Sequence, residues 1–233
     1  MLSFVTALAI AGPTEINLEG WKIMLESGVL ADKDWPEAKA ELTRQLQNIK
    51  RMFDDKPLKN LQNVAIWVNS DSKVTQCMAY HPDRGWLTNN GANPDMAKSV
   101  ELGSCKRFVD WTYIQPWMVL HELAHAYHHQ FLEKGFENPT VLSAFKKSME
   151  TKKYDSVLHW DGRTTKHYAT TNQMEYFAEV TESYFGTNDF FPFIRAELRN
   201  FDPEAVLLMK QIWGAPEKRV RNALKVKQVR TTE

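Results

Sequence analysis

The sequence predicts a protein of the α+β class. Most runs that suit β-strands lie in the first half of the 233-residue chain, and amphipathic segments with helical spacing dominate the second half. Hydrophobic residues make up 43% of the chain and charged residues 25%, so a core can form without disulfide bonds. The separation of strands from helices argues against an alternating βαβ fold.

In the first half, residues 14–27 alternate well enough for a strand or hairpin. Residues 34–53 predict a helix, because apolar side chains recur at helical spacing from Leu42 to Phe53. Three further strands are expected over residues 63–71, 75–82 and 97–104, with a loop at 89–94 between the last two.

In the second half, residues 115–135 predict one long helix, with Pro116 in its first turn and Gly135 as its C-terminal cap. Further helices are expected over 138–151, 170–186 and 202–214. Between them, residues 154–169 predict a hairpin with a type I′ turn at Asp161-Gly162.

We expect a single domain over residues 13–216, with strands and one helix in 13–114 and helices in 115–216. Residues 1–12 are apolar and uncharged but too short to cross a bilayer, so no integral membrane segment is expected. They fit a signal-peptide remnant, which implies a secreted or periplasmic protein, or an N-terminal strand, which leaves a cytoplasmic one open. Residues 217–233 form a basic tail that we expect to be solvated.

The charge balance limits the partners of the chain. Lys and Arg number 29 and Asp and Glu number 29, so nucleic acid is not expected as a partner. Cys77 and Cys105 are not spaced as a CxxC pair, and we expect neither to bind metal. Whether they form a disulfide is left open by the sequence.

The stretch VLHELAHAYHHQF, residues 119–131, holds four of the seven histidines. His121 and His125 lie four residues apart, on one face of the predicted helix, and can bind one tetrahedral Zn²⁺. Glu122 lies one position round the helix, where it can reach a water molecule as a general base. The alternative is a structural histidine pair, but the flanking residues are apolar, as a buried metal helix requires.

A catalytic zinc site needs a third protein ligand. His129 lies about 12 Å along the axis from His121 at 1.5 Å per residue, and His128 lies further round the helix, so neither fits. The helix at 170–186 offers Glu175, Glu179 and Glu182 instead.

We expect Glu175 to bind the metal and Glu179 to accept the free N–H of a ligand histidine. The alternative, a solvated acidic face, conflicts with the apolar and aromatic neighbours of these residues. Tyr168 precedes this helix at an expected strand end, and its phenol can donate to an oxyanion or simply pack in the core.

These residues together resemble a known family. His121-Glu122-x-x-His125, followed by Tyr168-x-x-Thr171-Asn172-x-x-Glu175-Tyr176-Phe177-Ala178-Glu179, is similar to the catalytic domain of anthrax lethal factor and its metallopeptidase relatives, which are gluzincins. The resemblance covers residues 97–190. The other domains of lethal factor have no counterpart here, so toxin activity is not implied.

The resemblance implies a zincin-like metallopeptidase fold with a small mixed sheet, an HExxH helix and a second helix carrying the Glu175 ligand. It also implies that Glu122 polarises water, that Tyr168 assists at the oxyanion, and that a substrate strand pairs with residues 99–102.

We therefore expect a zinc-dependent metalloendopeptidase that acts on a peptide or protein substrate. A non-catalytic zinc-binding interaction protein and a zinc amidase acting on a non-peptide bond are the alternatives.

The remaining side chains divide into two groups. Trp111, Tyr113, Trp117 and residues 190–193 can line pockets or pack in the core, and His81, His159 and His167 are expected to have no metal role.

Overall fold

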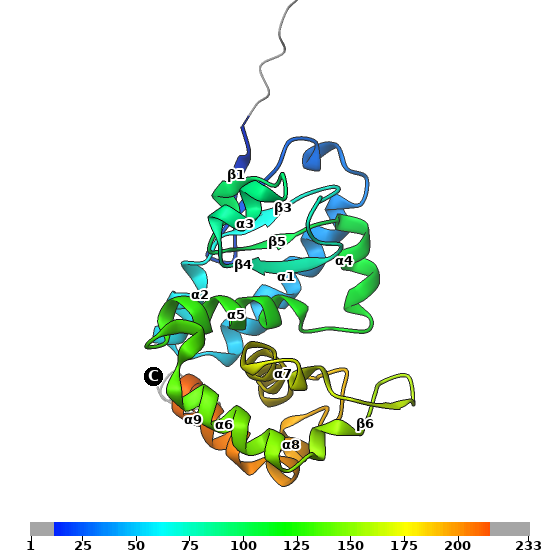
Figure 1. Cartoon of the computed structure of the whole chain (residues 1–233). Coiled ribbons are helices and arrows are strands. Elements are labelled where there is room, and N and C mark those ends of the chain that lie inside the picture. Colours follow the sequence, from blue (N-terminus) through cyan, green and yellow to red (C-terminus); the bar gives the residue numbers. More distant parts are fainter. Residues whose placement is uncertain (1–11, 215–233) are drawn as a thin grey trace, which may run out of the picture.

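The computed structural model describes residues 12–214, and the expectations for residues 1–11 and for the tail at 217–233 lie outside that range. The described chain has a small sheet with helices below it (Figure 1), which confirms the α+β class. No helix among the described residues is long and apolar enough to span a membrane.

The sheet has five strands in the order β1-β2-β3-β5-β4 and is mixed. The strands are β1 (Thr14–Leu18), β2 (Trp21–Leu25), β3 (Ile66–Val68), β4 (Met78–His81) and β5 (Ser99–Leu102). β2, β3 and β5 run parallel to one another, while β1 pairs antiparallel with β2 and β4 antiparallel with β5. All the strands expected in the first half are confirmed, and β4 forms one edge of the sheet.

Two hairpin turns differ in type. Glu19 and Gly20, with φ of 54° and 99°, join β1 to β2 in the positive-φ geometry of a two-residue type I′ turn. The second hairpin pairs β6 (Val157–Leu158) with β7 (Thr164–Thr165). Its predicted type I′ turn is wrong, because Gly162 has a positive φ of 86° but Asp161 does not.

The helices are α1 (Trp35–Met52), α2 (Asp55–Gln62), α3 (Arg84–Asn89), α4 (Cys105–Thr112), α5 (Met118–Phe131), α6 (Pro139–Glu150), α7 (Gln173–Phe185), α8 (Arg195–Phe201) and α9 (Pro203–Trp213). The sequence predicted α1, α6, α7 and α9 closely. The sequence analysis missed the short helices α2, α3, α4 and α8, since six to eight residues carry too few turns to show a clear period.

The helix predicted over 115–135 is shorter at both ends. α5 begins after Trp117, and Leu132 ends it in an extended conformation. Lys134 takes a left-handed φ of 62°, and Gly135 starts a 3₁₀ turn instead of capping the helix. Pro116 therefore precedes the helix and does not lie in its first turn.

α5 lies directly beneath the sheet, where it contacts β4 and β5, and α7 packs against its other side (Figure 1). The close approach of the two helices depends on Gly186 at the end of α7. A Cβ atom at this position would overlap the indole of Trp117, which packs against the main core. α3 covers the opposite face of the sheet, where Leu87 packs on Trp67 of β3.

Cys77 and Cys105 are both buried and both free, so no disulfide joins them in the structure. Burial raises the pKa of each thiol to about 12. They behave as small apolar core residues, and Cys77 lies against Met118 at the start of α5.

Asp202 is fully buried and joins three segments of the helical half. Its Oδ2 accepts hydrogen bonds from Ser148 Oγ (2.7 Å), Tyr154 Oη (2.8 Å) and Tyr176 Oη (3.2 Å). Its Oδ1 accepts from the backbone N–H of Ala205, which caps α9. Lys153 Nζ also lies 3.2 Å from Oδ1, so one carboxylate serves five donors.

We expect Asp202→Ala to lower the free energy of unfolding by about 3–5 kcal/mol, because buried hydroxyls and a cap lose their acceptor. Urea unfolding followed by circular dichroism measures this. Glu204→Ala is the matched control, since Glu204 pairs with Lys147 at the surface and should cost less than about 1 kcal/mol. Equal losses in the two variants would contradict this role of Asp202.

Candidate active site

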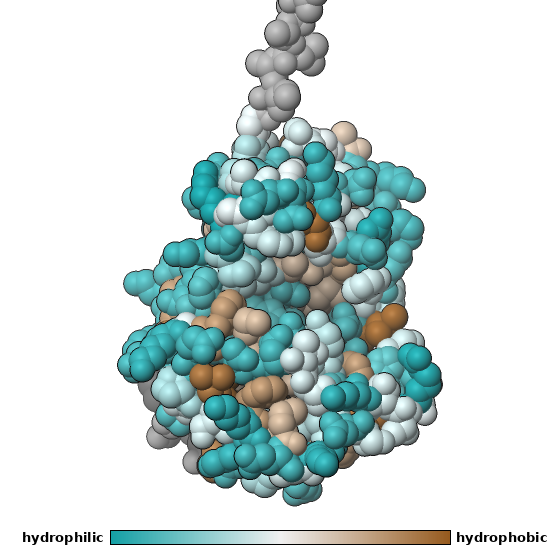
Figure 2. All heavy atoms as spheres, in the orientation of Figure 1, coloured by the Kyte–Doolittle hydropathy of each residue, from teal (hydrophilic) through white to brown (hydrophobic). Residues whose placement is uncertain are grey.

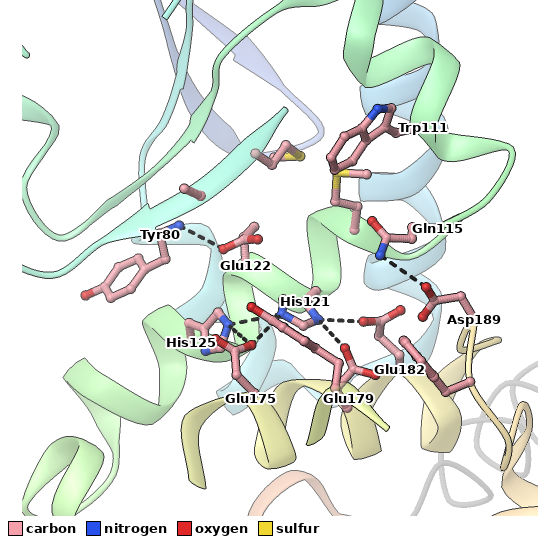
Figure 3. A pocket seen from close by; sticks show the side chains of 15 residues that line it. Tyr80, Trp111, Gln115, His121, Glu122, His125, Glu175, Glu179, Glu182 and Asp189 are labelled. Atoms are coloured by element: carbon pink, nitrogen blue, oxygen red, sulfur yellow. Dashed lines mark hydrogen bonds and ion pairs between the residues drawn. The ribbon is translucent and has the colours of Figure 1, made fainter. Parts of the chain in front are cut away.

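α5 and α7 bring three ligand-type side chains to one point (Figure 3). His121 and His125 project from α5, and Glu175 projects from the first turn of α7. Asn172 fixes the start of α7, because its side chain accepts the backbone N–H groups of Met174 and Glu175.

The three side chains form a nearly equilateral triangle. His121 Nε2 and His125 Nε2 are 3.1 Å apart, and Glu175 Oε2 is 3.2 Å from each. Tetrahedral zinc with ligands at 2.0–2.1 Å requires its ligand atoms to be about 3.3 Å apart. The donor set, its spacing and the open pocket beside it therefore fit a zinc ion with one coordination position left for water or substrate.

His121 has its second nitrogen engaged as well. Nδ1 lies 2.6 Å from Glu182 Oε1 and 3.6 Å from Glu179 Oε1. With Nδ1–H donating to Glu182, Nε2 keeps its lone pair for a metal. The expectation that Glu179 accepts this N–H is corrected: Glu182 is the nearer carboxylate, while Glu179 Oε2 accepts from Asn188 Nδ2 at 2.8 Å.

The charges at this point depend on one another. Burial opposes a charge on His121, but Glu175 and Glu182 outweigh it and raise the pKa of His121. Burial also opposes the charge of Glu175, and the two histidines outweigh it and lower the pKa of Glu175. The pKa values of Glu179 and Glu182 are raised, first by burial. Burial thus disfavours the negative charge of Glu179 and Glu182, and a cation bound nearby would favour it.

A cavity of about 510 Å³ opens beside the triangle. The described residues that line it include five carboxylates and two histidines but no Lys or Arg: Met78, Ala79, Tyr80, Trp111, Gln115, Met118, His121, Glu122, His125, Tyr168, Glu175, Glu179, Glu182, Asp189 and Phe190. Figure 2 shows a recess on this side of the molecule, between the sheet and the lower helices.

Glu122 lies between the metal triangle and the sheet (Figure 3). Its Oε2 accepts the backbone N–H of Tyr80 in β4 at 2.8 Å. This bond holds the Glu122 carboxylate beside the cavity. The preceding residue of α5, His121, is a corner of the triangle. Glu122 can therefore take a proton from a water molecule in the cavity.

Tyr168 lines the same cavity and is 47% exposed. It starts a 3₁₀ turn, Tyr168–Thr170, and does not end a strand as expected. Burial and then the negative charge of Glu175 raise the pKa of its phenol, which keeps the group protonated at neutral pH. Tyr168 can therefore act as a hydrogen-bond donor at the mouth of the cavity, and it is not a core tyrosine.

The strand at the sheet edge beside the cavity is β4. The resemblance to the lethal factor peptidases implied residues 99–102 as the partner of a substrate strand, but these form β5, which already pairs with β3 and β4. That expectation is wrong. β4 lies at the edge of the sheet, and Met78, Ala79 and Tyr80 line the cavity.

The other histidines lie apart from the triangle. His128 is buried against Phe136 and Phe177, and burial lowers its pKa to about 3. His129 Nδ1 lies 2.8 Å from the Tyr80 hydroxyl, and His81 pairs with Glu101. Among residues 12–214, the two clusters with metal-ligand geometry both contain His121.

Of the aromatic residues with an open role, Trp111 and Phe190 line the cavity, Trp117 packs in the core and Tyr113 is exposed elsewhere. The sequence analysis gave no role to Gln115 and Asp189, which also line the cavity and share a hydrogen bond of 3.2 Å. Glu182 carried a usable signal, because it lies on the same face of α7 as Glu175 and Glu179.

The chain matches no protein-family model, and no curated protein sequence matches it. Its structure is similar to that of the Pro-Pro endopeptidase from Paenibacillus alvei, with a TM-score of 0.48 and 17% sequence identity. The similarity covers 82% of this chain and 96% of that one.

Proposed function

We propose that this protein is a zinc-dependent metalloendopeptidase of the gluzincin type, related in its site to the lethal factor peptidases. The observation that carries the proposal is the triangle of His121, His125 and Glu175, spaced for one tetrahedral ion, with Glu122 held beside an open cavity. The metal ligands and the base come from two helices that pack directly against each other.

Zn²⁺ in this triangle would act as a Lewis acid toward the scissile carbonyl and lower the pKa of water toward neutrality. Glu122 accepts a proton from the attacking water and returns it to the leaving amine. Tyr168 donates a hydrogen bond to the oxygen on which negative charge develops. Glu182 holds His121 in the tautomer that leaves Nε2 unprotonated.

The edge position of β4 favours a peptide over a non-peptide substrate. A strand at the edge of a sheet presents backbone groups that can pair with an extended chain. A zinc amidase would have no evident use for this edge. A purely structural zinc site usually closes with four protein ligands, whereas this triangle faces a cavity lined by Glu122 and Tyr168.

Metal removal tests the proposal. We expect the purified protein to contain about one zinc per chain by elemental analysis and to cleave a peptide library, because three ligands are in place. A chelator should abolish cleavage and added Zn²⁺ should restore it. A protein that cleaves equally well after complete metal removal, or that binds zinc and cleaves no peptide, would contradict the proposal.

A further inference from the structure

A second cavity lies across β4 from the metal site. It has a volume of about 440 Å³ and is lined by Val74, Ala79, Tyr80, His81, Pro82, Asp83 and Trp86. Alternate side chains of a strand point to opposite faces of the sheet. Tyr80 points toward α5, where its hydroxyl meets His129, and His81 points toward α3, where it stacks on Trp86 at 6.0 Å.

The backbone of β4 determines how a peptide could be added. Tyr80 donates its N–H to Glu122, away from β5, whereas the carbonyl of Cys77 accepts the N–H of Gly103 within the sheet. In an antiparallel pair such directions alternate along the strand. The backbone groups of Met78 and Tyr80 therefore face the open edge. Glu122 holds the Tyr80 N–H, and the Met78 carbonyl accepts from Thr75 Oγ1 at 3.2 Å, so the Met78 N–H and the Tyr80 carbonyl remain to pair with a peptide. A peptide lying along this edge has side chains that alternate between the two faces.

One set of these side chains would face the metal cavity, and the other set would face the cavity at Trp86. Ala79 has only a methyl group on the second face, so it leaves room for a side chain of the added strand. Trp86 stands beside it with 48% of its surface exposed. We infer that Val74, Ala79, Pro82 and Trp86 form a specificity pocket for a large apolar side chain of the peptide substrate. This inference rests on the proposed peptidase function.

The buried polar groups of this pocket are already engaged, which favours an apolar occupant. His81 Nε2 lies 2.6 Å from Glu101 Oε2, and Asn69 Nδ2 donates to Glu101 Oε1 at 2.6 Å. His81 and Glu101 are 3% and 0% exposed. Asp83 Oδ1 accepts the backbone N–H of Trp86 and so caps α3. The contact between His81 and Glu101 thus fixes the His81 ring beneath the Trp86 indole.

The test compares Trp86→Ala with Trp160→Ala, a matched control because Trp160 is 52% exposed and lines neither cavity. Peptide libraries varied over three positions on each side of the cleaved bond report selectivity as kcat/KM. We expect the parent protein to prefer Leu, Met or Phe over Ala by about tenfold at one position within the span of β4. Trp86→Ala should lose this preference at that position only, and Trp160→Ala should retain it.

A binding measurement separates the specificity pocket from the proposed reaction. Peptides that carry Leu or Ala at the selected position are titrated into Glu122→Gln protein by fluorescence anisotropy. If the cleavage assay shows no preference at any position, peptide pairs with Leu or Ala at each position in turn are titrated. The Leu peptide should bind about tenfold more tightly, and adding Trp86→Ala should remove the difference.

Each outcome then decides between the two proposals. Cleavage whose apolar preference survives in Trp86→Ala overturns the pocket and leaves the peptidase standing, as does a preference for Lys or Arg at that position. Selective binding that depends on Trp86 without any cleavage overturns the peptidase and leaves the pocket standing. A parent protein that neither binds nor cleaves any peptide overturns both.

Discussion

Glu122→Gln is expected to abolish most peptide hydrolysis while leaving zinc binding intact. A positioned general base contributes about 10²–10⁴-fold to the rate of such reactions, so kcat should fall by about that factor. The glutamine oxygen can still accept the N–H of Tyr80, which donates to Glu122 in the native protein. The fold and the triangle of metal ligands should therefore be retained.

The measurement pairs kcat on a cleaved peptide with zinc content by elemental analysis. Glu133→Gln is the matched control, because Glu133 is exposed just beyond the end of α5. It should match the parent protein in both quantities. If Glu122→Gln protein cleaves as fast as the parent, Glu122 is not the base, and the role of the Tyr80 contact must be reconsidered.

The fold was largely predictable because its strands and long helices have regular patterns. α1, α6, α7 and α9 carry apolar residues at helical spacing, together with caps such as Asn172 and Asp202. α2, α3, α4 and α8 were missed, since a helix of two turns barely shows a period. The ends of α5 were predicted wrongly because Pro116 and Gly135 fit helix boundaries in general but here lie outside the helix.

The candidate site was predictable where the chemistry depends on local spacing. HExxH places both histidines on one face of α5, and the apolar residues around Glu175 indicated a buried acid. The choice between Glu179 and Glu182 as the partner of His121 depends on how α7 is rotated against α5, which one sequence does not specify. The strand order, which puts β4 at the edge in place of β5, is likewise a property of long-range pairing.

The three glutamates of α7 are expected to differ sharply in their effects on zinc affinity. Glu175→Ala removes one corner of the triangle and should weaken zinc binding by more than about 100-fold, beyond the 10- to 100-fold typical when an outer partner is lost. Glu182→Gln should fall within that lower range, because an amide oxygen can still accept from His121 Nδ1 but carries no charge.

Glu179→Gln provides the internal comparison, since Glu179 is as deeply buried as Glu182. Glu179 lies 3.6 Å from His121 Nδ1, however, and bonds to Asn188. Its zinc affinity should remain the closest of the three to that of the parent protein. Competition with a chromogenic chelator measures all three dissociation constants, and urea unfolding of the metal-free proteins separates lost binding from lost folding. The ranking follows from distance alone: a direct ligand, a hydrogen-bonded neighbour and a more distant carboxylate on one helix face. Equal zinc affinity across the three variants would mean that α7 does not supply the third ligand, and the proposed metal centre would fail with it.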